Sequence, residues 1–174
     1  ARFAQDCKTQ GFTPAYGASG GTARESALKT IATASGGTVA GGLQGFPWWD
    51  DAPAVKTFRD AMAKYAAGKP YQDPTSTNTW SSLELFRKAM AKASDTPTKE
   101  EVVTAMLSLK DEDLGGLLPQ KMTYTAGQPA PLVTCYYLYQ YTAAGGMKSA
   151  ATTAPSGNSV TSGNLKSDCF PAKS

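Results

Sequence analysis

Residues 50–70, DDAPAVKTFRDAMAKYAAGKP, carry the clearest periodicity in the chain. Apolar residues recur there at steps of three and four and therefore share one face of a helix: Val55, Phe58, Met62 and Tyr65. We expect Asp51 to cap the start of this helix, and Pro53 suits the first turn because an N–H there has no partner inside the helix. Gly68 and Pro70 predict where it ends.

Two more amphipathic helices are predicted downstream. Residues 78–93, NTWSSLELFRKAMAKA, place one apolar stripe on a helix: Trp80, Leu83, Phe86 and Met90. Residues 98–101, TKEE, form a capping box that predicts a third helix, whose apolar row is Val102, Met106 and Leu109. Three such helices in succession cannot bury their stripes alone, so we expect them to cover another part of the molecule.

Composition fits one globular domain, because 174 residues of which 41% are hydrophobic suffice for a core. The net charge of +3 comes from scattered residues rather than a basic stripe with aromatic residues, so we predict no nucleic-acid partner. No apolar run approaches the roughly 20 residues of a membrane-spanning helix, and no signal peptide is present. We expect no direct membrane insertion of this stretch, and a mature form or a fragment if the protein is secreted.

Histidine is absent, which excludes Ser-His-Asp and Cys-His nucleophilic mechanisms and most zinc sites. Acidic clusters fall at predicted helix ends, where capping and the helix dipole account for them: Asp50-Asp51, Glu100-Glu101 and Asp111-Glu112-Asp113. We therefore predict no enzymatic activity, no cofactor and no metal site.

Three cysteines, Cys7, Cys135 and Cys169, allow two interpretations. They are buried thiols in a cytosolic protein, or one disulfide plus an odd thiol in a secreted one. The low charge content of 18% and the Ser/Thr/Gly-rich C-terminal end favour the secreted case.

The N-terminal third predicts an α/β fold. Residues 1–11 are typical of the second half of a helix, and residues 12–21 of a short strand that enters a glycine-rich loop. Residues 22–25, TARE, form a second capping box, which predicts a helix with Ala27, Leu28 and Ile31 inward and an end at Gly36. TVAGGLQGF at 38–46 predicts a second strand. Helix, strand, helix and strand in this order indicate an open parallel sheet flanked by helices.

Two features of this region bear on a ligand site. The loop 17–21, GASGG, lacks the lysine and the spacing of a phosphate-binding loop, so a strand-to-helix turn is favoured. It nevertheless follows a strand, and ligands of open α/β sheets usually lie at the carboxyl ends of strands. The aromatic run at 46–49, FPWW, either packs a seam between two parts of the molecule or lines a pocket.

The C-terminal part predicts an antiparallel hairpin over 118–142. Met122 and Tyr124 alternate with polar residues on its first strand, Gly127 marks the turn, and four tyrosines on the second strand suit core and rim positions: Tyr136, Tyr137, Tyr139 and Tyr141. Residues 143–168 offer little to bury and are expected to form a mobile tail that ends in a small anchor at 168–170. A disulfide between Cys135 and Cys169 would attach this tail to the last strand.

The order of these segments resembles the C-terminal portion of a type I periplasmic (solute-binding) protein of the branched-chain amino acid ABC-transporter class. The matching segments cover residues 1–142: CKTQGF, YGASGG, SGGTVAGGL, the helix at 50–70, TWSSLELFRKAMAKA, PTKEEVVTAMLSLKDEDLGGLLP and MTYTAGQPAPLVTCYYLYQY. In that family two α/β lobes close on a solute, and three chain crossings join the lobes.

The resemblance implies a division of the chain. Residues 1–46 would belong to the second lobe, 47–117 would be the helical part of the first lobe, and 118–174 would cross back into a second-lobe hairpin with a Ser/Thr/Gly-rich tail. Crossings would lie near 46–49 and 117–120. The partners implied are a small-molecule solute, an ABC permease and the remainder of its own two-lobe protein.

The resemblance also implies ligand positions. Ser19, with Ala18 as the neighbouring alternative, stands where the family often presents an acidic residue to an amino group, and Gly20 follows it. Thr75 replaces a family tyrosine, and Trp80 takes the later aromatic position on the same helix. Phe46 and Trp48 complete the expected set. These departures argue for a neutral or anionic solute, amino-acid-like or an aromatic acid or amide, over a standard zwitterion.

The function predicted is therefore capture of a small organic solute in the periplasm or outside the cell, with a lipid anchor at a missing N-terminus as one form. Two alternatives stay open. A sensor domain of the same fold would signal to a partner protein, and a secreted α/β enzyme would need a nucleophile or acid pair that this stretch lacks.

Overall fold

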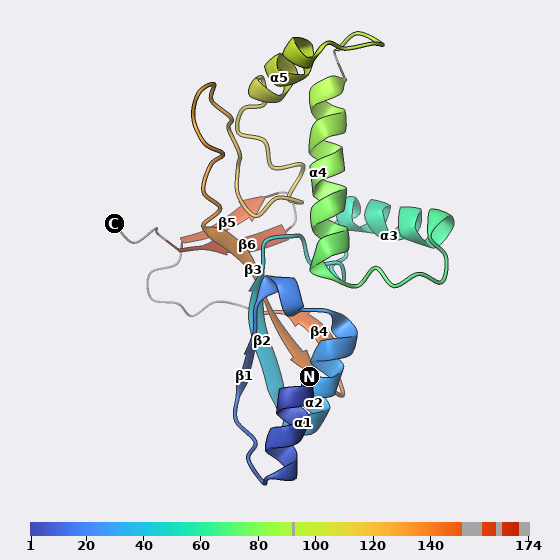
Figure 1. The fold of residues 1–174 in the computed structure, drawn as a ribbon, viewed down its shortest axis with the longest axis vertical. Helices are drawn as coiled ribbons and strands as arrows, with labels where there is room; N and C mark the ends of the chain where they lie inside the picture. The colour runs from blue at the N-terminus through green and yellow to red at the C-terminus, as the bar shows by residue number, and fades with distance from the viewer. Residues whose placement is uncertain (92, 151–157, 163–164, 171–174) are drawn as a thin grey trace.

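A mixed sheet organises the molecule. The computed structural model describes residues 1–91, 93–150, 158–162 and 165–170, and six strands in these residues form one sheet in the order β1-β2-β3-β6-β5, with β4 paired to β3 (Figure 1). Their bounds are Tyr16–Ala18 for β1, Thr38–Leu43 for β2, Cys135–Thr142 for β3, Gly146–Ser149 for β4, Asn158–Ser162 for β5 and Leu165–Cys169 for β6. β1 and β2 are parallel, and the remaining pairs are antiparallel. The α/β class is confirmed, while the parallel part is limited to one strand pair.

Two helices flank the N-terminal strands, α1 at Arg2–Thr9 and α2 at Glu25–Ser35. α1 packs on α2 (Figure 1). Leu28 and Ala32 of α2 are buried in the same core as Val39 of β2. Gly36 ends α2 in the left-handed region at φ 67°, as predicted. The predicted capping box at 22–25 is wrong.

Instead of capping α2, Thr22 belongs to a short 3₁₀ turn, η1 at Gly20–Thr22, and its hydroxyl donates to the Ser19 carbonyl at 3.0 Å. That local bond keeps the Thr22 side chain away from the α2 N-terminus. α2 begins after Arg24 without a side-chain cap.

Helix α3, Pro53–Tyr65, meets the prediction for most of its apolar face, since Val55 and Phe58 are buried and Met62 packs against the core. Tyr65, predicted on the same face, is 77% exposed. The predicted cap of α3 is wrong. Ala52 is the capping position, and the carboxylate of Asp50, rather than that of Asp51, accepts the Ala52 N–H at 2.8 Å.

Helix α4, Pro74–Met90, begins earlier than predicted because Asp73 caps it, accepting the N–H groups of Thr75 at 2.8 Å and Ser76 at 3.1 Å. Its predicted apolar stripe is wrong in part: Leu83 is 62% exposed and Phe86 46% exposed, whereas Trp80 and Met90 are partly buried and pack against the core clusters. A different row of α4 is buried: Pro74, Thr77, Ser81, Leu85 and Ala89. The small residues of this row allow close packing against the rest of the molecule.

Helix α5, Lys99–Leu107, has the predicted capping box. The Thr98 hydroxyl accepts the Glu101 N–H at 3.2 Å, and the Glu101 carboxylate accepts the Thr98 N–H at 2.7 Å. Behind it, Leu85, Ala89 and Leu109 form a small cluster separate from the main core.

An antiparallel hairpin is present at the C-terminal end, but its strands differ from those predicted over 118–142. Met122 makes only an isolated bridge with Glu112, whereas β3 folds back on β4 and also pairs with β2 and β6. The expected mobile tail is also wrong where the structure describes it, because β4, β5 and β6 lie within 143–168. Residues 151–157 and 163–164 of that tail lie outside the described residues.

Tyrosines of β3 fill the main core on one face of the strand, because Tyr137, Tyr139 and Tyr141 alternate with less buried residues. The Tyr139 hydroxyl donates to the Ala18 carbonyl at 3.1 Å, and burial raises the pKa of Tyr139 to about 12. Gly41 on β2 makes this approach possible, since a Cβ there would stand 2.1 Å from the Ala18 carbonyl oxygen.

Candidate functional site

The carboxyl ends of the two parallel strands meet the first turns of α4. Ser19 follows β1 and Gln44 follows β2, and η1 contacts α4. A Cβ on Gly45 would lie 2.4 Å from the Thr77 hydroxyl oxygen and 2.6 Å from the Asn78 side-chain oxygen. The chain leaving β2 therefore passes directly against α4 at a position where only glycine fits without displacement.

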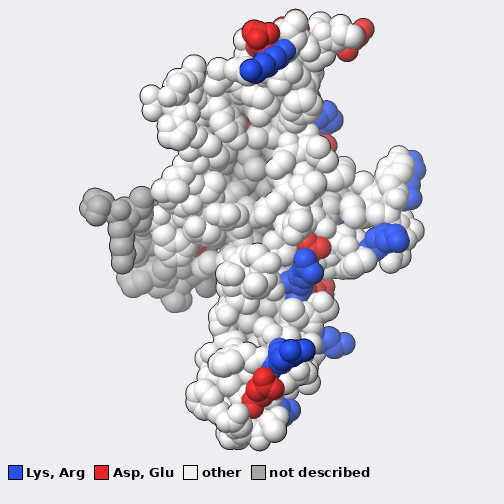
Figure 2. All heavy atoms as spheres, viewed as in Figure 1, with Lys and Arg blue, Asp and Glu red and all other residues white. Residues whose placement is uncertain are grey.

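A cleft of about 230 Å³ opens beside this junction. Its polar wall is formed by Gln44 from the end of β2 and by Asn78, Ser81 and Ser82 from one side of α4. Its opposite wall is mainly apolar and is completed by Leu85, Leu118, Pro119, Met122, Tyr124 and Val133. Figure 2 shows this face hollowed between α4 and the loop of residues 120–134, with most charged side chains at the periphery.

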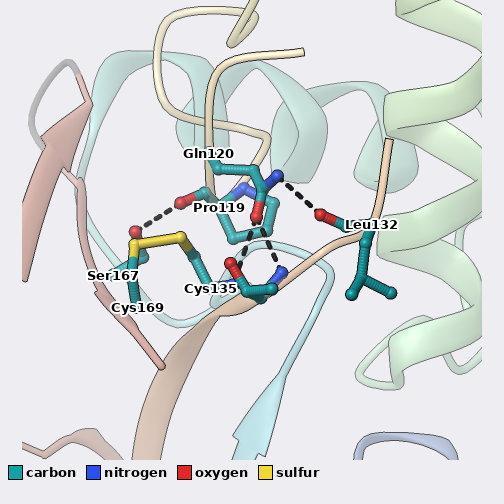
Figure 3. Close-up of a disulfide and its surroundings, with 7 residues drawn as sticks. Pro119, Gln120, Leu132, Cys135, Ser167 and Cys169 are labelled. Carbon is teal, nitrogen blue, oxygen red and sulfur yellow. Dashed lines mark hydrogen bonds between the residues drawn. A yellow bond between two sulfur atoms is a disulfide. The ribbon is translucent and has the colours of Figure 1, made fainter. Parts of the chain in front are cut away.

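Segments 117–120 and 132–135 form the far wall, and one side chain holds them together. The amide oxygen of Gln120 accepts the N–H groups of Thr134 at 2.8 Å and Cys135 at 3.2 Å, and its amide nitrogen donates to the Leu132 carbonyl at 3.0 Å (Figure 3). Pro119 and Val133 are lining residues on either side of this clamp, so Gln120 positions the wall of the cleft.

The same wall is anchored to two other elements. Ser167 of β6 donates to the Pro119 carbonyl, and the disulfide between Cys135 and Cys169 ties β6 to β3 (Figure 3). On the other side, the buried Ser81 hydroxyl donates to the Leu117 carbonyl at 3.2 Å, which joins the wall to α4. Cys7 is a free thiol.

None of the six predicted ligand residues lines this cleft. Ser19 is exposed, with its hydroxyl oxygen 3.3 Å from that of Thr22, and a Cβ on Gly20 would stand 3.2 Å from the Gly42 carbonyl oxygen. Thr75 is exposed on the first turn of α4. Their roles toward a ligand stay predictions.

The predicted aromatic residues come together, but in the core. Phe46 is fully buried and Trp48 is 3% exposed. The Phe58 ring packs edge-on against Phe46 at 5.1 Å and against Trp80 at 5.4 Å between centroids. The run at 46–49 was predicted either to pack a seam or to line a pocket, and in the described structure Phe46 and Trp48 pack the seam.

Sequence reasoning missed Gln44, Asn78 and Ser82. A signal existed for Asn78 and Ser82, because residues four apart lie on one side of a helix. Gln44 had the signal of a polar residue directly after a strand of an α/β sheet. Neither signal predicts which loop from another part of the chain forms the opposite wall of the cleft. In the structure, residues of segments 117–124 and 133 form that wall.

A second hollow of about 840 Å³ lies between the C-terminal half of α4 and α5. Alanine and leucine side chains form much of its surface, and Lys88 pairs with the buried carboxylate of Glu112 at 2.5 Å along one edge. Phe86 and Val103 are exposed nearby on the same two helices. The described residues contain no cluster of side chains suited to a metal ion, and none of their helices is long and apolar enough to cross a membrane.

A family model described as periplasmic binding protein matches residues 1–146. No curated protein matches the chain.

Three solved structures share the fold at low sequence identity. A possible leucine/isoleucine/valine-binding protein from Rhodopirellula baltica has a TM-score of 0.68 and 18% identity, over 86% of this chain and 39% of its own. A fatty acid ABC transporter substrate-binding protein from Thermomonospora curvata has a TM-score of 0.62 and 21% identity, over 84% and 38%. A branched-chain amino acid ABC transporter protein from Thermus thermophilus with bound valine has a TM-score of 0.57 and 12% identity, over 87% and 43%. The chain thus spans about two fifths of each.

Proposed function

Because the chain belongs to the periplasmic binding protein family, we propose that it is part of an extracytoplasmic protein that captures a small organic solute for an ABC importer. The observation that carries the proposal is the cleft beside the junction of β2 with α4, lined by Gln44 from the carboxyl end of β2. Ligands of open α/β sheets bind at this end of the strands, and the cleft there combines uncharged polar groups with an apolar wall.

The proposal extends to the organisation of the whole protein. Residues 1–46 are assigned to the second lobe, 47–117 to the first lobe, and 118–174 to the return into the second lobe. The exposed Leu83 and Phe86 of α4 support this assignment, because a helix with a second apolar face suits a position between two layers. The rest of a two-lobe protein would cover that face, and an ABC permease would receive the solute.

The solute proposed is neutral or anionic, amino-acid-like or an aromatic acid or amide. Of the similar structures, two are described as proteins for branched-chain amino acids and another as a fatty acid transporter protein, so the fold serves chemically different solutes. Ser19 and Thr75 offer hydroxyl groups at the junction, and neither supplies a charge that would pair with a zwitterion.

A screen on the longest natural form of the protein that contains this chain tests the proposal. We expect at least one solute from a library of amino acids, aromatic acids and amides to raise the melting temperature, since a ligand that binds only the folded state stabilises it. Small-angle scattering should then show a smaller radius of gyration with the solute, which should be recovered unchanged. Turnover of the solute, or no stabilisation by any library member, would contradict the proposed role.

A further inference from the structure

We propose that the cleft at Gln44 and Asn78 is a binding site for a small uncharged amide with a compact apolar body. This inference deepens the solute-binding role proposed above and rests on it. It names residues that neither the family resemblance nor the comparisons assign, and it narrows the solute to one charge state.

Two carboxamides stand together on the polar wall. The Asn78 side chain packs against Gly45, since its oxygen would lie 2.6 Å from a Cβ there, and Gln44 is the preceding residue. Both side chains line the cleft, and within the described part of the chain neither carboxamide makes a hydrogen bond. Each can donate and accept, so the pair matches a primary amide, which also offers both functions.

The other lining residues select against charge. Among the described residues, no Asp, Glu, Lys or Arg lines the cleft, and the titratable group on its wall is the phenol of Tyr124. Gln44 and Asn78 are exposed, so a carboxylate or ammonium group entering the cleft would keep part of its hydration, but it would lose the rest against the apolar wall without gaining an opposite charge. An uncharged amide loses only its hydrogen bonds to water, and the two carboxamides can replace them.

The apolar wall limits the size and shape of the apolar part of the ligand. Leu85, Leu118, Met122 and Val133 face a space of about 230 Å³, comparable to that of about eight liquid water molecules. This space suits a single aromatic or branched aliphatic group carrying the amide. Gln120 and the Cys135–Cys169 disulfide fix the position of this wall, so the shape of the site is largely formed before binding.

Benzamide, benzoate and benzylamine test the inference, because the three share a ring and differ in charge. The full chain labelled with nitrogen-15 is titrated with each, and the side-chain NH₂ signals of Gln44 and Asn78 report directly on the proposed contacts. We expect saturable shifts of both signals with benzamide, and binding at least about tenfold weaker for benzoate and benzylamine, as the loss of one good hydrogen bond or an unpaired charge implies.

Substitutions at Gln44 and Asn78 test whether these two side chains bind benzamide directly. Gln44→Leu and Asn78→Leu should each weaken benzamide binding by about tenfold, whereas Gln10→Leu, at an exposed position at the end of α1, should leave it unchanged. An unchanged spectrum outside the cleft verifies that the variants fold.

Three outcomes overturn the inference: no saturable shift with benzamide, equal or tighter binding of benzoate or benzylamine, or benzamide binding that Gln44→Leu leaves intact. Tighter binding of benzoate at the same residues would leave the solute-binding role standing and remove the uncharged class. Absence of binding by all three probes removes this site, while the library screen with scattering on the longer protein still decides the role independently.

Discussion

Helices α3 and α4 show the same sequence pattern and different burial. In α3 the row at steps of three and four is buried at Val55 and Phe58, although its last member, Tyr65, is 77% exposed. The Phe58 ring packs among Phe46, Tyr71 and Trp80. In α4 the predicted stripe contains the exposed Leu83 and Phe86, and a row centred on Ser81 and Leu85 faces inward. Periodicity therefore predicts that a helix forms, but the layer available to cover it decides which face is buried.

The difference also separates two kinds of apolar surface. The α3 face belongs to a core shared with the sheet. The exposed Leu83 and Phe86 of α4 belong to neither of the two core clusters formed by the described residues. Leu83 and Phe86 are three positions apart and therefore lie on one side of the helix, where a further part of the protein could cover them. This placement is consistent with the proposal that another part of a two-lobe protein lies there.

The largest expected effect comes from truncating one phenylalanine on each helix. Phe58→Ala should lower the free energy of unfolding by about 3–5 kcal/mol, because a buried ring leaves a cavity that the aromatic neighbours cannot fill. Phe86→Ala should change it by less than about 0.5 kcal/mol in this chain, since its ring is already half in solvent. Urea unfolding of both variants measures the difference, and equal losses would show that the outer face of α4 is buried in solution.

A second effect, of about 3–4 kcal/mol, is expected from removing the disulfide that closes a loop across 34 positions. The doubly substituted Cys135→Ala/Cys169→Ala chain should lose this stability and expose the amides of β5 and β6 to hydrogen exchange first, because β6 is held to the rest of the molecule through β3. The matched control is Cys7→Ala, which removes the free thiol. Equal protection of β5 and β6 in the double variant would refute an anchoring role.

Local signals allowed the prediction of much of the fold, and distant partners limited the rest. The strands β1, β2 and β3, the C-terminal end of α2 at Gly36 and the capping box at Thr98 follow from residues within a few positions of each other. The first strand of the hairpin predicted over 118–142 is absent because local sequence does not determine which segment pairs with it. Met122 forms an isolated bridge with Glu112, while β3 pairs with β4 and β6. Low apolar content made the tail look mobile, although backbone pairing with β3 orders the part described.

Prediction of the candidate site was limited in the same way, by contacts between residues far apart in the sequence. The carboxyl ends of the strands were predicted as the place to look, and Ser19 and Gln44 lie there. The cleft itself depends on Gly45 meeting Asn78 and on Gln120 joining two loop segments, and both contacts link residues far apart in the sequence. Aromatic residues were predicted at the seam, and their burial could be decided only by the ring packing around Phe58.

The smallest expected effect comes from removing the cap of α5, a helix that depends on local hydrogen bonds, whereas α3 depends on packing. Within the described part of the chain no residue of α5 is buried, so its stability depends strongly on the capping box at Thr98. Thr98→Ala should cost about 1 kcal/mol and should raise hydrogen exchange in α5 while leaving α3 protected. Thr104→Ala, at an exposed position within the same helix, is the matched control and should maintain or improve helix stability, because alanine has the higher helix propensity. Unchanged exchange in the Thr98→Ala chain would mean that packing against α4, rather than the cap, holds α5 in place.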